Sequence, residues 1–227
     1  MQPESSKYLI FTRRGVDINN YPAIKRHLIQ FEERLMPKPK NWKGGACNGR
    51  KPGTYQWYEI QDSIDYHAEF EKQKIIWPEI AKSIRFAICP PGIYTNNKVF
   101  ILPIADLFLL GILNSRITWF YLKHTCSILG DADKGGRPMF QEVFVKTLPI
   151  RTIDFSDPAD VARHDRMVTL VDQMLALHKQ LPQARTPHEQ TALQRQIEAT
   201  DRHIDALVYE LYALTEEEIA IVEGNAR

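Results

Sequence analysis

The sequence predicts an α+β fold, with a mixed α/β domain followed by an antiparallel two-helix hairpin and a short C-terminal helix. Two observations predict it. Short β-branched and aromatic runs alternate with helical patterns up to Ile150, and two long helical patterns fill the remainder. With 227 residues, 44% of them hydrophobic, the chain is long enough to bury a large core. The predicted domains are therefore 1–150 (α+β domain) and 151–227 (helical hairpin, a packing, dimerisation or docking region).

The first hundred residues are expected to hold short strands and one amphipathic helix. Pro22 fits the first turn of a helix over 22–35, where Ile24, Leu28 and Phe31 recur at helical spacing. A short helix is expected over 62–70. Runs rich in β-branched and aromatic residues predict strands over 7–13, from Trp57 onward, and over 74–77, 85–89 and 98–102.

The next segment is predicted to supply core. Residues 104–122 form a nearly all-apolar pattern, which indicates one buried helix. Asn114 within it is expected either to hydrogen-bond to backbone or to reach DNA from a helix end. A glycine-bearing loop over 128–138 follows, and residues 140–148 alternate as a strand would.

Beyond Ile150 the pattern is helical. Asp157 and Pro158 predict a helix start, and the pattern ends before Pro182. Thr186 and Glu189 form a capping box that opens a second long helix. Thr215 caps a further short helix. Because the apolar faces exceed what two isolated helices can bury, the hairpin is expected to pack on the α+β domain or on a partner's helices.

The most distinctive segment runs from Arg34 to Tyr58, with six cations, no acid and four aromatic residues. Cations neutralise phosphates, and aromatic rings lie against sugars or bases, so the segment is typical of a nucleic-acid surface. Its many prolines and glycines predict a loop. The alternative is a solvated basic loop without a ligand.

Charge is distributed unevenly along the chain. Residues 1–60 carry +6 (11 basic against 5 acidic), residues 61–150 carry +1, and residues 151–227 carry −6 (8 basic against 14 acidic). The whole-chain charge of +1 conceals this difference. The asymmetry predicts a polyanion-binding front and an acidic rear.

The sequence lacks the motifs of several enzyme classes. The sequence has no G-x-G, no G-x-x-x-x-G-K-[ST], no acid two residues before a lysine and no Asn-Pro-Pro-aromatic motif. Its seven histidines and three cysteines lack metal-ligand spacing. We therefore expect no catalytic site and no metal site. The cysteine pattern, the polar start and the lack of an 18-residue apolar run predict a reduced, cytoplasmic protein without a membrane span.

A resemblance to a known family rests on segments that follow one another in the expected order, at 8–18, 21–24, 57–61, 70–77, 109–115, 147–150 and 204–219. Examples are Tyr8-Leu-Ile-Phe-Thr-Arg-Arg-Gly and Thr147-Leu-Pro-Ile. Together they resemble the TaqI-like C-terminal specificity (target recognition) domains of type IIG restriction-modification enzymes, over about Lys7 to Gly224.

The resemblance implies an α+β target-recognition domain that reads double-stranded DNA. In that family an upstream adenine N6-methyltransferase domain, often with a nuclease domain, does the chemistry. These regions are missing from this sequence, so they are expected in cis or as a separate subunit, and S-adenosylmethionine and Mg would bind there rather than here. Arginines are expected to read guanine and lysines to meet phosphate. The residues expected to face DNA are Arg13, Arg14, Lys38, Lys40, Trp42, Lys43, Arg50, Lys51, Tyr55, Tyr58, Lys72, Lys74, Lys134 and Arg137.

Two other classes of function fit the residues. An RNA or single-strand binder would need exposed aromatic rings in the basic segment. A protein-interaction scaffold built on the helical hairpin would bind no nucleic acid in a salt-dependent way. Competition between duplex and single strands separates the first from duplex recognition, and a salt titration separates the second.

Overall fold

The structure, a computed structural model, describes residues 7–45, 48–131 and 135–224 and confirms the α+β class. The chain divides into two compact units, an N-terminal unit that ends at Ala68 and a main unit that begins at Glu69. The change of sequence pattern at residue 150 falls inside the main unit, because the two long helices pack on the helices before it. The assignment of residues 1–150 as a recognition domain stays a prediction.

The N-terminal unit is mostly loop. It contains a 3-10 helix η1 (Ile18–Asn20), helix α1 (Pro22–Ile29) and the single turn α2 (Glu32–Leu35), and the 3-10 helix η2 (Asp65–Glu71) follows at its end. Pro22 opens α1 as predicted, but the helix expected over 22–35 is interrupted at Gln30 and Phe31. None of the α1 residues is buried. This unit is therefore held by contacts other than an apolar helix face.

The main unit is built on a three-stranded antiparallel sheet. Strand β1 (Lys74–Pro78) lies between β2 (Ala87–Cys89) and β3 (Val99–Leu102), which gives the order β2-β1-β3. Trp77 pairs with Phe100 across the sheet, their rings stack with centroids 5.5 Å apart, and the Trp77 Nε1 donates to the Phe140 carbonyl at 2.8 Å. The three strands predicted here are confirmed, within two residues at each end.

The apolar segment predicted as one helix is two. Helix α3 (Leu107–Leu113) ends at Asn114, and Ser115 caps α4 (Arg116–Thr125). The Asn114 side chain accepts from the Phe86 N–H at 3.1 Å and donates to the Phe86 carbonyl at 3.0 Å. Asn114 thus hydrogen-bonds to backbone near β2, as predicted, although the residue is half-buried rather than fully buried.

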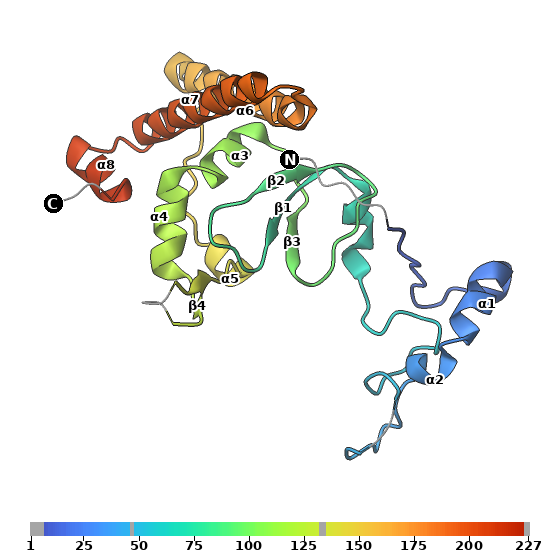
Figure 1. The fold of residues 1–227 in the computed structure, drawn as a ribbon. Helices are drawn as coiled ribbons and strands as arrows, with labels where there is room; N and C mark the ends of the chain where they lie inside the picture. Colours follow the sequence, from blue (N-terminus) through green and yellow to red (C-terminus); the bar gives the residue numbers. More distant parts are fainter. Residues whose placement is uncertain (1–6, 46–47, 132–134, 225–227) are drawn as a thin grey trace. The chain divides into compact units, whose positions relative to one another are not determined.

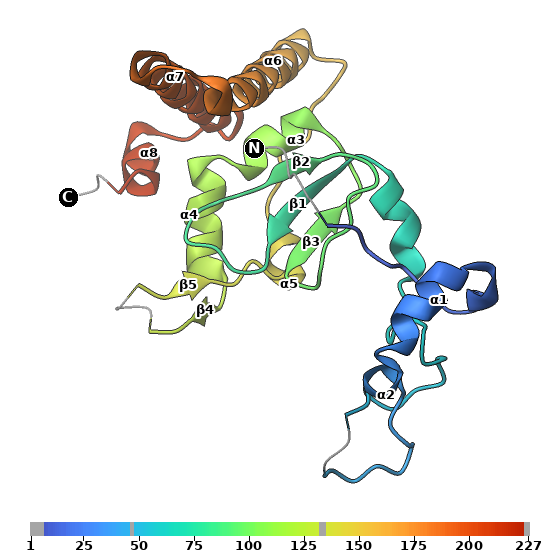
Figure 2. The same cartoon turned by 45° about the vertical axis from the view of Figure 1, so that its right-hand side comes forward.

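The C-terminal helices follow the predicted caps. Asp157 caps α6 (Pro158–Gln180), and after the 3-10 turn η4 (Leu181–Gln183) the Thr186–Glu189 capping box opens α7 (Pro187–Leu211). Thr215 and Glu218 cap α8 (Glu216–Val222) in the same way. Within the main unit, α6 and α7 lie along each other, with α3 between them and the sheet (Figures 1 and 2).

Close packing joins α3 to α6. An added Cβ at Gly111 would lie 2.5 Å from the Met167 Sδ and 3.0 Å from the Val171 Cγ2, so only glycine fits there without a shift. Both partners are buried, and they belong to the same core as Ile75 and Leu122. The hairpin is accordingly part of the main unit's core, in agreement with the first of the two predicted packing modes.

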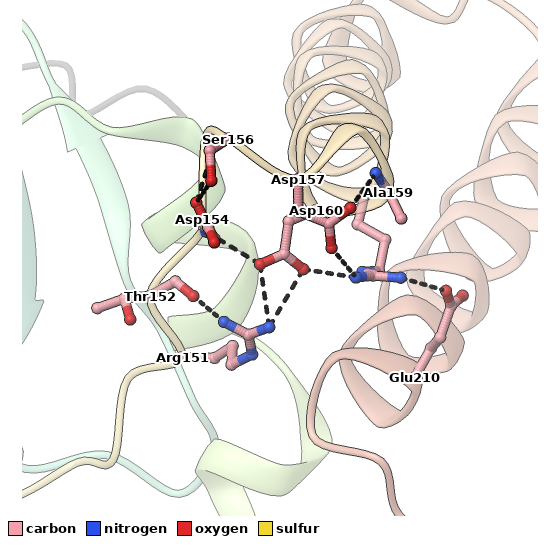
Figure 3. Close-up of polar contacts among 9 residues, drawn as sticks. Arg151, Thr152, Asp154, Ser156, Asp157, Ala159, Asp160 and Glu210 are labelled. Carbon is pink, nitrogen blue, oxygen red and sulfur yellow. Dashed lines mark hydrogen bonds and ion pairs between the residues drawn. The ribbon is translucent and has the colours of Figure 1, made fainter.

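A buried carboxylate fastens the start of α6 (Figure 3). Asp160 is 2% exposed and accepts from the Arg151 guanidinium at 3.0 and 3.1 Å, from Arg163 at 2.5 Å and from the Asp154 N–H at 2.9 Å. Arg163 also pairs with Glu210 of α7 at 3.7 Å. The Arg163 hydrogen bond and the Asp154 amide lower the pKa of Asp160 to about 2. The segment before α6, α6 itself and α7 are thus linked by charge.

A second buried carboxylate links α7 to α4. Asp205 accepts from the Arg116 N–H at 2.8 Å and pairs with the Arg116 Nε at 3.0 Å. Asp205 is 4% exposed, and burial raises its pKa to about 6 despite the guanidinium. Desolvation therefore outweighs the ion pair at this position.

Three predicted strands are wrong. Residues 7–13 form no strand, because their backbone finds one described sheet-like partner, the Ile60 N–H that donates to the Thr12 carbonyl at 2.8 Å. Trp57 and the residues after it form turns. Residues 140–148 contain helix α5 (Glu142–Val145), whose Phe144 and Val145 pack on the core. The glycine loop before it is a small hairpin of β4 (Ile128–Leu129) and β5 (Arg137–Pro138). No described helix is both long and apolar enough to cross a membrane.

Candidate nucleic-acid interface

The basic loop, defined as residues 38–49, projects from a narrow stem. Pro37 and Arg50 pair as a β-bridge, where the Lys38 N–H donates to the Arg50 carbonyl at 3.0 Å and the Arg50 N–H donates to the Met36 carbonyl at 2.9 Å. A Cβ at Gly49 would lie 2.5 Å from the Met36 oxygen, so the stem requires glycine. For its described residues, 38–45 and 48–49, the prediction of a loop is confirmed.

Arg50 anchors this stem. Its guanidinium donates three hydrogen bonds to backbone carbonyls, to Leu35 at 2.7 Å, to Glu59 at 2.8 Å and to Trp57 at 2.8 Å. The fork of guanidinium donors suits such a set of acceptors, which a lysine would not satisfy. These bonds also explain the missing strand after Trp57, since the carbonyls of that segment are occupied. Arg50 is therefore turned inward, away from any ligand, and burial lowers its pKa from the ordinary value.

Glu59 and Tyr55 complete the anchor. The Glu59 carboxylate is buried and accepts from the Gly15 N–H at 2.6 Å and from the Gln56 N–H at 2.8 Å. Tyr55 is 3% exposed and donates its hydroxyl to the Lys51 carbonyl. The Arg50 guanidinium lies 4.7 Å from the Tyr55 ring centroid. Tyr55 is consequently part of the anchor and presents no open ring face for a base.

The outer part of the loop is exposed. Lys40 and Lys43 are open to solvent, and in the part of the chain that the structure describes they make no ion pair. The Trp42 N–H closes a turn onto the Pro39 carbonyl at 3.0 Å, and the Trp42 side chain is 38% exposed. The Lys38 ammonium lies 3.8 Å from the Trp42 ring centroid, a cation–π contact. The loop thus presents Lys40, Lys43 and the Trp42 indole to solvent, and the half-buried Lys38 lies against the indole ring.

A second group of candidates lies beside the stem. Lys51 pairs with Asp62, and the Arg14 guanidinium donates to the Gln61 carbonyl at 3.1 Å and lies 5.8 Å from the Tyr55 ring centroid. Arg13 is exposed and contacts the His67 Nε2 at 3.2 Å. Tyr58 is half-buried with its ring edge-on to Trp57, at 5.5 Å between centroids.

The candidate DNA-binding residues of the main unit differ in their exposure to solvent. Lys74 is fully buried, and its ammonium donates to the carbonyls of Phe70 at 2.9 Å, Pro90 at 3.1 Å and Lys72 at 3.2 Å. As the expectation for Lys74 required an accessible ammonium, the structure corrects it to a buried anchor. Lys72 is exposed and pairs with Glu69 at 2.9 Å. Arg137 is exposed in β5, and Lys134 lies outside the described residues.

The structure therefore separates the predicted DNA-binding residues by role. Arg50, Tyr55 and Lys74 hold backbone, whereas Lys40, Trp42 and Lys43 are presented to solvent. Sequence reasoning missed Glu59 and Asp62. The sequence did contain a signal for both residues, because they are the first acids after a long acid-free segment. Acids at the end of such a segment are the nearest carboxylates with which its cations can interact.

The model of one protein family, described as the TaqI-like C-terminal specificity domain, matches residues 7–150. No curated protein matches the chain. The matched residues include the basic loop, its anchor, the sheet and helices α3 to α5, and they leave out α6 to α8. The chain belongs to the TaqI-like C-terminal specificity domain family, whose role is the recognition of DNA targets in restriction-modification.

Proposed function

We propose that this chain reads sequence in duplex DNA as the specificity module of a restriction-modification system. In this proposal it is a type IIG-like module without a catalytic site of its own. Adenine N6-methylation and cleavage, together with S-adenosylmethionine and Mg, belong to a methyltransferase and nuclease region in the same polypeptide or in another subunit. The family supports DNA target recognition, and the missing catalytic motifs support a purely recognising role.

One observation carries the duplex assignment. Lys40 and Lys43 are exposed on a loop whose stem is held in place by the Arg50 hydrogen bonds, so two cations face solvent from a fixed part of the backbone. Loops held by a rigid anchor are where binding residues concentrate. Exposed lysines meet phosphate without reading bases, so they supply affinity and orientation. Arg13, Arg14 and Arg137 are the remaining exposed arginines among the candidates, and we assign any base contact to them.

The aromatic residues of the basic segment, Arg34 to Tyr58, favour duplex over single strands. A single-strand surface stacks successive bases on several exposed rings. Here Tyr55 is buried, Trp57 and Tyr58 are half-buried against each other, and Trp42 already carries the Lys38 ammonium. The scaffold alternative loses support as well, because α6 and α7 place Met167, Val171 and Leu207 in the main unit's own core.

The test is a competition titration with a labelled random duplex and unlabelled duplex, single-stranded DNA and RNA of equal length. We expect a dissociation constant for non-target duplex of about 10⁻⁴–10⁻⁶ M near physiological salt, and duplex as the best competitor. Stronger competition by single strands or RNA would contradict duplex recognition. Incubation of plasmid with the protein, Mg and S-adenosylmethionine should leave the DNA neither methylated nor cut.

A further inference from the structure

Two acids follow the acid-free segment, and they have opposite environments. Glu59 is 6% exposed and accepts backbone N–H groups inside the anchor. Asp62 is exposed, at 64% of its side chain, and faces Lys51. Among the described residues of the N-terminal unit, Asp62 is the carboxylate that forms an ion pair with a candidate DNA-binding cation.

The Asp62 carboxylate is held on both oxygens. Its Oδ1 accepts from the Lys51 ammonium and its Oδ2 from the Gln61 amide at 3.1 Å. The Gln61 Oε1 in turn accepts from the Lys51 N–H at 3.3 Å, and the Gln61 carbonyl accepts from Arg14. The Lys51 hydrogen bond, followed by that of Gln61, lowers the pKa of Asp62, so the carboxylate is charged at neutral pH.

A carboxylate in this position does what a phosphate of DNA would do. Both are anionic oxygen acceptors for the same ammonium donors. Lys51 meets a phosphate only by giving up Asp62, and the negative charge of Asp62 also acts on Arg14. We propose that Asp62 is an internal competitor that occupies Lys51 and lowers the affinity of this surface for DNA. This inference rests on the proposed function, because it assumes that the surface binds duplex phosphate.

The expected size follows from the exposure of the pair. Solvent screens an ion pair between two exposed side chains, so that such a pair changes an equilibrium constant by about 1.4- to 5-fold. The release of Lys51 should therefore tighten duplex binding by about 1.4- to 5-fold. The effect is small, as befits a contact that DNA must displace readily.

The test uses two isosteric variants of the whole chain, Asp62→Asn and Asp65→Asn. Asp65 lies three residues away and accepts from the Ser63 hydroxyl at 2.5 Å, and it forms no ion pair with a candidate cation among the described residues. Both variants remove one negative charge and keep a side-chain acceptor. Asp62→Asn should bind a labelled random duplex about 1.4- to 5-fold more tightly than Asp65→Asn at equal salt, and equal melting temperatures check that both fold.

A second background isolates the pair. When Lys51 is replaced by methionine, the advantage of Asp62→Asn over Asp65→Asn should disappear. If the two variants bind equally in the parent background, or if the advantage persists with Lys51→Met, the internal-competitor inference is wrong while the proposed function stands. If the parent chain and every variant fail to bind duplex at low salt, the proposed function is wrong, and this inference with it.

Discussion

Arg50 gives the sharpest prediction, because sequence and structure assign it different roles. As an arginine in a basic loop it is expected to read a base, and its replacement would then change sequence preference and leave folding intact. In the structure it donates to the carbonyls of Leu35, Trp57 and Glu59. Its replacement by alanine is therefore predicted to open the stem of the basic loop and to weaken binding to all duplexes together.

The magnitude follows from these three bonds. A net value of about 1 kcal/mol for each hydrogen bond gives a destabilisation of about 3 kcal/mol. The N-terminal unit has little else to compensate, since Ile18 and Tyr55 are the buried hydrophobic side chains among its described residues. A destabilisation of this size raises the population of the open state about a hundredfold.

Hydrogen exchange followed by mass spectrometry measures this opening in peptides from residues 7–68. Arg50→Ala should speed exchange in them by about a hundredfold. Arg50→Lys should also speed it, because the three Arg50 hydrogen bonds come from three different nitrogens, Nε, Nη1 and Nη2, and a single ammonium nitrogen cannot take all three positions. Lys43→Ala, which changes an exposed cation of the same loop, is the control and should leave exchange unchanged. Unchanged exchange in Arg50→Ala together with altered preference at one base pair would refute the anchoring role.

Three further predictions concern the main unit. Lys74→Met leaves the carbonyls around the buried ammonium without their donor, so it should destabilise the unit by about 3 kcal/mol in urea unfolding. A variant as stable as the parent would contradict the buried anchoring role of Lys74. Asp205 has a pKa raised by burial to about 6 from 3.8, so its stabilising protonation is complete below about pH 4 and is lost as pH rises through 6. Asp205→Asn should therefore gain up to about 3 kcal/mol over the parent at pH 7.5 and little at pH 4, and a variant that is weaker at both pH values would show that the ion pair dominates. Gly111→Val should cost about 1–3 kcal/mol by forcing α3 and α6 apart, and an unchanged melting temperature would mean that Met167 makes room freely.

Local signals predicted the helical part of the fold well. Asp157, Thr186 and Thr215 cap their helices as expected, since a cap depends on the side chain and the few N–H groups beside it. The core strands β1, β2 and β3 were predicted for a similar reason, because their apolar runs are short and bounded by turn residues. These features need no knowledge of distant contacts.

Elements decided by distant contacts were missed. Asn114 divides the apolar helix because it bonds to Phe86, which lies 28 residues earlier. The segment after Trp57 is not a strand because Arg50 takes its carbonyls. The apolar pattern of residues 140–148 fits the helical period as well as the strand period, since Phe144, Val145 and Leu148 suit either. In the structure the segment forms helix α5, which packs Phe144 and Val145 against the core.

The candidate site was predicted by composition and corrected by geometry. Charge identified the loop, and Lys40 and Lys43 are indeed exposed. Charge alone could not distinguish them from Arg50 or Lys74, because a cation that donates to backbone carbonyls has the same sequence appearance as one that awaits a phosphate. The difference depends on which carbonyls fold back within reach.

The most direct test of duplex recognition through the basic loop is a salt titration of the variant Lys38→Ala, Lys40→Ala, Lys43→Ala. The slope of log K against log salt concentration should fall by about 0.9 for each phosphate that the variant no longer neutralises, and binding should weaken alike for all duplexes. The matched control replaces three exposed cations elsewhere, Lys123, Lys179 and Arg195, by alanine and should keep the parent's slope. If the loop variant is folded and binds duplex with the parent's affinity and slope, the basic loop is ordinary solvated surface, and the central claim is wrong.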